Sequence, residues 1–164
     1  MDFAYTAIRA GNSFRASPLE TVTVARDHRP MHDSPPYEAE TQGVVVRVRP
    51  AYLAGQSDPD EGRWVWAYQV EIENRGDQTI QLMARRWIIT DATGHVETVR
   101  GPGVVGEQPV IAPGDSYSYA SGCPLPTPSG TMEGAFMMTD ATGRSFEAAI
   151  PAFSLDVPGG RVLN

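Results

Sequence analysis

The feature that most constrains the fold is the distribution of apolar residues, which occur in short runs that each end at a turn signal. The chain has 16 Gly and 14 Pro among 164 residues, and no window of a dozen residues keeps the 3.6-residue period of an amphipathic helix. Short runs of this kind are typical of all-β sandwiches and barrels. The sequence therefore predicts an immunoglobulin-like or fibronectin-III-like β-sandwich of seven or eight antiparallel strands.

The clearest strand lies at residues 64–73, where large apolar side chains occupy every second position. Residues of one parity point to the same face of a strand, so one buried face is predicted for these positions. They are Trp64, Trp66, Tyr68, Val70 and Ile72. Aromatic side chains at this spacing fill sandwich interiors, which favours a core role over a binding platform. A surface role is left open for Trp64 alone, because it adjoins an acidic loop.

The segment after this strand changes its apolar parity. Ile80 and Leu82 share one parity, whereas Trp87 and Ile89 share the other. A strand can keep both pairs on its buried side only if an extra residue is inserted or the strand crosses between sheets. We expect this irregularity within residues 83–86.

Two kinds of loop can be recognised. The pentapeptide Thr-Asp-Ala-Thr-Gly occurs at residues 90–94 and again at 139–143, each time between two apolar runs, which predicts two short hairpin loops. The Pro-rich segment at residues 124–130 predicts a stiff, extended loop that crosses between the sheets. Stiff loops lose little entropy on binding, so Pro126, Thr127 and Ser129 are candidate partner-binding residues.

Residues 101–106 match the pattern G-x-G-x-x-G of dinucleotide-binding proteins. That fingerprint requires a helix directly after the glycines, whereas Pro109 and Pro113 follow here, so a Rossmann fold is excluded. The loop remains a candidate for binding a nucleotide or pyrophosphate through its N–H groups, or for binding a protein partner. Its candidate residues are Arg100, Gly101, Gly103, Gly106 and Glu107. Against an anion, Pro102 has no N–H and the carboxylate of Glu107 would repel phosphate.

Charge and composition limit the classes of partner that the chain can bind. The net charge is −7, and all 13 basic residues are Arg. Proteins that track a nucleic-acid backbone carry basic stripes, so we do not expect that function. No run approaches the roughly 20 apolar residues that cross a bilayer, so no membrane association is expected. A single cysteine, Cys123, allows no internal disulfide bond and suits a reducing compartment. We therefore expect a cytoplasmic protein.

The first thirty residues differ from the remainder, because they carry a formal charge of +1 from four Arg and three acidic residues. We expect residues 1–30 to be a disordered extension, with Met31 as the natural start, and residues 31–164 to form a single domain.

No residues with the spacing of a known catalytic or metal site are found. The sequence has no G-x-S-x-G or H-E-x-x-H motif, and after residue 32 His95 and Cys123 are the only imidazole and thiol. His28 lies in the extension and His32 just after it, and Pro30 between them argues against a shared metal site. We therefore expect no enzymatic activity, no cofactor and no metal site.

Several longer strings resemble the ApaG family over about residues 37–156. They are VWAY (65–68), IENRG (72–76), VRGPGVVGEQP (99–109), GCPLPTPSG (122–130) and IPAFSL (150–155). The resemblance implies a fibronectin-III-like sandwich in a bacterial protein, often dimeric, with a genetic link to cobalt and magnesium tolerance and a role in binding partners. One departure is Arg86, where family members often have His.

Two functions follow as hypotheses. The first is a non-catalytic module that binds another protein, or a second copy of itself as a homodimer. The alternative is a small-ligand protein that holds a nucleotide or pyrophosphate at residues 101–106.

Overall fold

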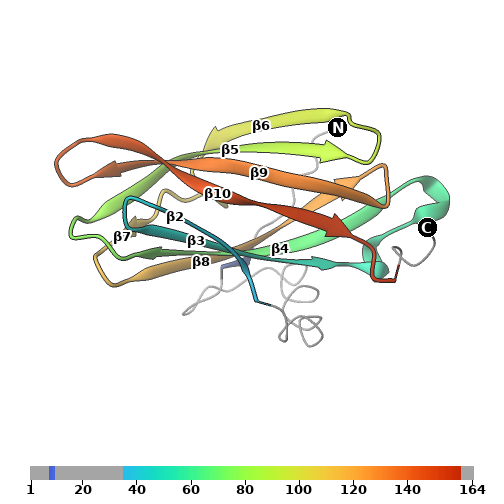
Figure 1. The fold of residues 1–164 in the computed structure, drawn as a ribbon, viewed down its shortest axis with the longest axis horizontal. Helices are drawn as coiled ribbons and strands as arrows, with labels where there is room; N and C mark the ends of the chain where they lie inside the picture. The colour runs from blue at the N-terminus through green and yellow to red at the C-terminus, as the bar shows by residue number, and fades with distance from the viewer. Residues whose placement is uncertain (1–7, 10–34, 160–164) are drawn as a thin grey trace.

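The computed structural model describes residues 8–9 and 35–159, which form a sandwich of two antiparallel sheets (Figure 1). The first sheet has the strand order β1-β8-β4-β3-β2. Its strands are β1 (Ile8–Arg9), β2 (Tyr37–Thr41), β3 (Val44–Tyr52), β4 (Trp64–Asn74) and β8 (Ser116–Leu125). Two 3₁₀ turns, η2 (Ala54–Gln56) and η3 (Pro59–Glu61), connect β3 to β4.

The second sheet has the order β10-β9-β5-β6, and a short strand, β7, also pairs with β5. Its strands are β5 (Ile80–Asp91), β6 (Val96–Pro102), β7 (Val110–Ile111), β9 (Ser129–Asp140) and β10 (Ser145–Asp156). The predicted all-β sandwich is confirmed. Eight of the described strands are longer than two residues, and β1 and β7 add two minimal strands.

The core fills the space between the sheets and is rich in aromatic rings. Trp87 of β5 lies at its centre, with ring centroids 5.2 Å from Tyr68, 6.0 Å from Phe153 and 6.5 Å from Phe136. Edge-to-face rings at these separations add stability beyond the area that they bury.

The predicted buried face of β4 is correct except at its start. Trp66, Tyr68, Val70 and Ile72 belong to the core, whereas Trp64 packs half-buried against its margin. The opposite face of β4 is also covered at this end, because Val65 and Ala67 form a second small cluster with Leu53.

The predicted irregularity in β5 is a bulge at Met83. Leu82 lies opposite Met138 of β9 and Ala84 lies opposite Met137, so Met83 is the extra residue. The insertion lets Leu82 and Trp87 both face the core despite their opposite parity.

The two repeated pentapeptides form hairpins with the same hydrogen bonds, as predicted. In the first, the Asp91 carboxylate accepts from the N–H of Thr93 at 2.8 Å and from the Thr93 hydroxyl at 2.6 Å. Asp140 accepts in the same way from Thr142. The bond from the threonine hydroxyl is the main reason why the pKa of each aspartate lies below its ordinary value.

One side of the sandwich is closed by β2. This strand pairs with β3 and also contacts β10, where Ala149 N donates to the Thr41 hydroxyl at 3.1 Å and the Tyr37 ring packs near Phe153. At the other end of the second sheet β6 pairs with β5 alone among the described strands. The β2 side of the sandwich is therefore covered, whereas β6 forms an exposed edge of the second sheet among the described strands.

Most of the predicted extension, residues 1–7 and 10–30, lies outside the described residues. The exception is β1, in which Ile8 pairs with Ala120 and Arg9 with Tyr119. Because β1 contributes only two residues to the sheet, we expect a chain that starts at Met31 to melt within about 4 °C of the full chain, roughly 1 kcal/mol at this size. Thermal unfolding followed by circular dichroism would measure this, and a larger loss would make the first thirty residues part of the fold.

Candidate functional site

The loop at residues 101–106 is built from hydrogen bonds that point into the protein. Gly103 N donates to the bulge carbonyl of Met83 at 2.8 Å, and Val104 and Glu107 exchange two backbone hydrogen bonds at 2.8 and 2.9 Å. The two residues between them have positive φ, 50° at Val105 and 76° at Gly106, as in a type I′ hairpin turn. Several N–H groups that an anion would need are therefore already used.

Side chains fix the same loop from both sides. The Arg85 guanidinium donates through Nη1 to the carbonyls of Pro102 and Gly103, both at 3.0 Å, and the Tyr117 hydroxyl donates to the Glu107 carboxylate at 3.1 Å. A Cβ on Gly103 would lie 2.1 Å from the Glu107 carbonyl oxygen, so only glycine fits. These contacts favour a scaffold role and do not favour binding of a nucleotide or pyrophosphate.

The second predicted loop is shorter than expected. β8 extends to Leu125 and β9 begins at Ser129, so only residues 126–128 connect the two strands. Pro124 and Pro126 are compatible with the extended backbone at this strand end. The connection does cross between the sheets. The Thr127 hydroxyl accepts from Ala92 N at 3.1 Å and donates to the Ser129 carbonyl at 2.8 Å, which ties this loop to the β5–β6 hairpin.

In the second sheet, an exposed edge with backbone groups that have no partner among the described residues lies at β6. At its two ends Asp91 N donates to the His95 carbonyl and Gly103 N donates to the Met83 carbonyl, so odd-numbered residues bond toward β5. Hydrogen bonding alternates along an antiparallel pair. The even-numbered residues Val96, Thr98 and Arg100 therefore direct their N–H and C=O groups away from β5. We call these three residues the open edge.

The open edge has a defined end. The next even-numbered residue, Pro102, has no N–H, and its carbonyl already accepts from Arg85. A proline at the end of a strand is also the one sequence signal that could have identified β6 as an edge, because proline is tolerated mainly in edge strands. The edge itself was not among the features predicted from the sequence.

Apolar side chains are exposed at both ends of this side of the second sheet. Val96 of β6 is 54 % exposed and Val110 of β7 is 63 % exposed, and both strands pair with the same edge of β5. Tyr37 is the only other large apolar residue classed as exposed in the described part of the chain. Exposed apolar residues beside unpaired backbone groups are features of strand-pairing surfaces.

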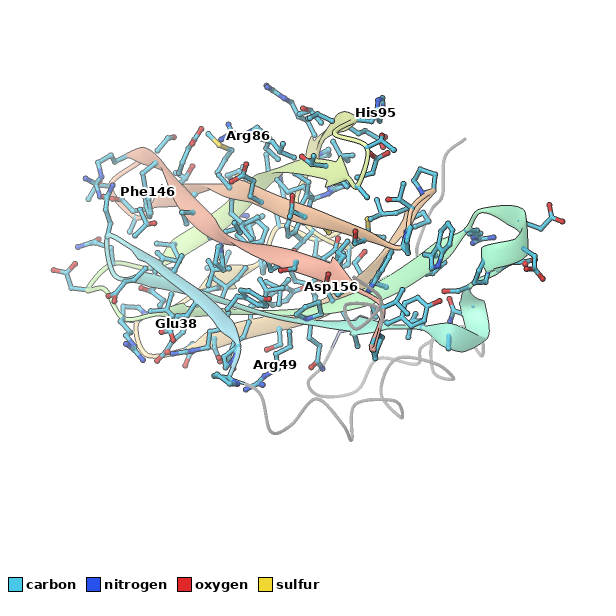
Figure 2. The ribbon with its side chains drawn as sticks, turned by 45° about the vertical axis from the view of Figure 1, so that its right-hand side comes forward. Glu38, Arg49, Arg86, His95, Phe146 and Asp156 are labelled. Carbon is cyan, nitrogen blue, oxygen red and sulfur yellow. The ribbon has the colours of Figure 1, made fainter. Side chains whose placement is uncertain are left out.

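Two arginines lie side by side on the outer face of the second sheet. Arg86 of β5 is directly opposite Arg100 of β6, and both point away from the core because their neighbours Trp87 and Val99 point into it. Arg86 binds Glu147 of β10 at 3.1 and 3.3 Å. Arg100 is exposed and has no ion pair with any described residue. Figure 2 shows Arg86 and His95 on the outer side of this sheet.

Groups that could perform chemistry are few in the described residues. No three His, Cys, Asp or Glu side chains are grouped so as to hold a metal ion there. Cys123 is buried, and desolvation raises the pKa of its thiol to about 12, which makes it a poor nucleophile. Within the same residues no helix is long and apolar enough to cross a membrane.

Comparisons with protein families, individual proteins and solved structures all find similarity to the same group of proteins. The family model described as the ApaG domain matches residues 54–140. Protein ApaG of Mesorhizobium japonicum is 58 % identical over 125 residues, which cover 76 % of this chain and 96 % of that protein. Protein ApaG of Rhodospirillum centenum is 59 % identical with the same coverage. The crystal structure of an ApaA protein from Bordetella pertussis has a TM-score of 0.69 at 44 % identity, covering 77 % of this chain and 99 % of that one.

Proposed function

The chain belongs to the ApaG family, and we propose that it is a non-catalytic module that binds another protein through the open edge of β6. The observation that supports this proposal is the set of N–H and C=O groups on Val96, Thr98 and Arg100 that have no partner among the described residues. Such an edge is a template for an extended segment of another chain, which adds to the sheet as one more strand.

The size of the edge indicates the type of interaction. Three outward-facing residues provide backbone bonds to a short segment only, and the exposed side chain of Val96 adds apolar contact area at one end. Small interfaces of this kind are typical of transient complexes rather than of permanent ones. Main-chain hydrogen bonds supply affinity in this mode, whereas side chains beside the strand supply selectivity.

Thr98→Pro tests the proposal directly. The Thr98 N–H points away from β5, so proline removes no hydrogen bond of the β5–β6 pair and should lower the free energy of unfolding by no more than about 1 kcal/mol. It does remove the central donor of the open edge. We expect the full chain to retain partners from a native lysate, and the proline variant to lose at least one of them, as measured by affinity capture and mass spectrometry.

The matched control is Thr98→Val, which keeps the N–H and should retain the same partners. Hydrogen exchange of the wild-type chain gives a second readout, because a bound strand should slow exchange at Val96, Thr98 and Arg100 and leave Glu97 and Val99 little changed. Unchanged capture by a folded proline variant, or partner-induced protection confined to other strands, would place the binding surface elsewhere.

A further inference from the structure

We propose that the open edge selects extended segments in which a carboxylate side chain precedes a β-branched apolar residue by four positions. This inference rests on the proposed function and specifies its partner. Side chains of an added strand that lie opposite Val96, Thr98 and Arg100 would share the outer face of the second sheet with them. An antiparallel segment therefore meets Arg100 first and Val96 four residues later.

The acidic position follows from the two arginines. Arg86 lies opposite Arg100, and its guanidinium is already engaged by both carboxylate oxygens of Glu147. Arg100 stands nearer the edge, is exposed and has no ion pair with a described residue. A carboxylate on the added strand, directly opposite Arg100, would supply the charge partner that the second sheet does not.

The apolar position follows from Val96. Its side chain is 54 % exposed at the far end of the open edge, in line with Thr98 and Arg100 on one face. A β-branched residue opposite Val96 would bury part of this surface, and cross-strand pairs of this type are favourable. Thr98 at the middle position accepts a small polar neighbour such as threonine.

A second copy of this chain fits the open edge less well. Two β6 strands that pair about Thr98 place Val96 of one opposite Arg100 of the other, and two that pair about Arg100 bring like charges together. Neither arrangement supplies a carboxylate to Arg100. Glu97, the only acidic residue of β6, has the opposite parity and points to the other face. The charge pattern therefore favours a different, acidic segment.

The probe is the peptide acetyl-Thr-Glu-Thr-Thr-Thr-Val-Thr-amide, titrated into the full ¹⁵N-labelled chain and followed by the backbone amide signals. We expect saturable shifts at Val96, Thr98 and Arg100 that are larger than those at Glu97 and Val99. Replacing the peptide glutamate by lysine should weaken binding roughly tenfold, because attraction to Arg100 becomes repulsion. Raising the salt concentration should weaken binding of the acidic peptide.

A charge exchange supplies the decisive control. The Arg100→Glu variant should no longer bind the acidic peptide and should bind the lysine peptide instead. The Thr98→Pro variant should bind neither peptide, because it lacks the backbone donor. Equal binding of the two peptides by the wild-type chain would overturn the acidic preference.

Different results would contradict the preference for an acidic segment and the proposed function. Absence of peptide binding, together with lysate capture that still depends on Thr98, would overturn the acidic segment and leave the proposed function standing. Shifts at the same amides that grow with protein concentration in the absence of peptide would also overturn it, in favour of a second copy.

Discussion

Asn74→Asp is expected to lower the free energy of unfolding by about 3–5 kcal/mol, although it changes one side-chain group only. Asn74 is the one polar residue classed as buried in the described part of the chain, at 1 % exposure. Its Nδ2 donates to the carbonyls of Gln78 and Ile111 at 2.8 and 2.9 Å, and its Oδ1 accepts from Gly76 N at 3.0 Å. A carboxylate would present an oxygen to two carbonyl oxygens in a buried site.

The effect should depend on pH in a defined direction. Burial opposes the charged form of the introduced carboxyl, so its pKa would be higher in the folded state than the value of about 3.9 in the unfolded state. The folded state then binds more protons, and the penalty grows as pH rises above the unfolded pKa and disappears below it. Asn74→Ala is the control, because it removes the same hydrogen bonds without adding a titratable group.

Urea unfolding at a series of pH values measures both variants. We expect the aspartate variant to be less stable than the alanine variant at pH 7, and the difference to shrink as pH falls toward 4. An aspartate variant as stable as the wild-type chain would show that the two carbonyls do not depend on the Asn74 amide.

Gly134→Ala is expected to lower the free energy of unfolding by about 3 kcal/mol or more, although replacing glycine by alanine is ordinarily a mild change within a strand. Gly134 lies in the middle of β9, opposite Trp87 of β5 and Ile150 of β10. A Cβ there would lie 1.9 Å from the Arg86 carbonyl oxygen and 3.2 Å from the Trp87 Cα. The obstacle is the backbone of a neighbouring strand, which cannot move without disturbing the pairing around Trp87.

The matched control is Gly55→Ala in η2, where a Cβ would have no atom within 4 Å and the backbone has no positive φ. We expect this variant to unfold within about 0.5 kcal/mol of the wild-type chain in the same urea measurement. A similarly small effect for Gly134→Ala would contradict the close approach of β5 and β9.

Much of the local structure could be predicted because it depends on neighbours in the chain. The parity switch between Leu82 and Trp87 required an extra residue, and the bulge at Met83 provides it. The repeated Asp-Ala-Thr-Gly segments carry their own turn chemistry, since Asp91 and Asp140 bond to residues two positions later. The alternating strand at residues 64–73 likewise predicted its own core face.

The contacts of Arg85 and Arg86 could not be predicted from neighbours in the chain. Arg85 and Arg86 are adjacent in sequence and point to opposite faces of β5, so one holds the 101–106 loop and the other an ion pair on the outer face. The sequence suggested that this loop could bind an anion, but the Gly103 N–H donates to the Met83 carbonyl and the Val104 N–H donates to the Glu107 carbonyl. Nothing in the local sequence singled out Asn74, yet its amide donates to the carbonyl of Ile111, 37 residues away.

By itself the sequence determined the all-β class, the two Asp-Ala-Thr-Gly hairpins, the need for an irregularity in β5 and the apolar side of β4, because periods of two and turn residues act over a few positions. Only the tertiary structure decided which strand lies at an edge. Pairing between β5 and β9 leaves β6 without a second neighbour among the described strands, and the open edge of Val96, Thr98 and Arg100 follows from that order. Strand order depends on contacts between residues far apart in the chain, and Pro102 at the end of β6 is the one local signal that bears on it.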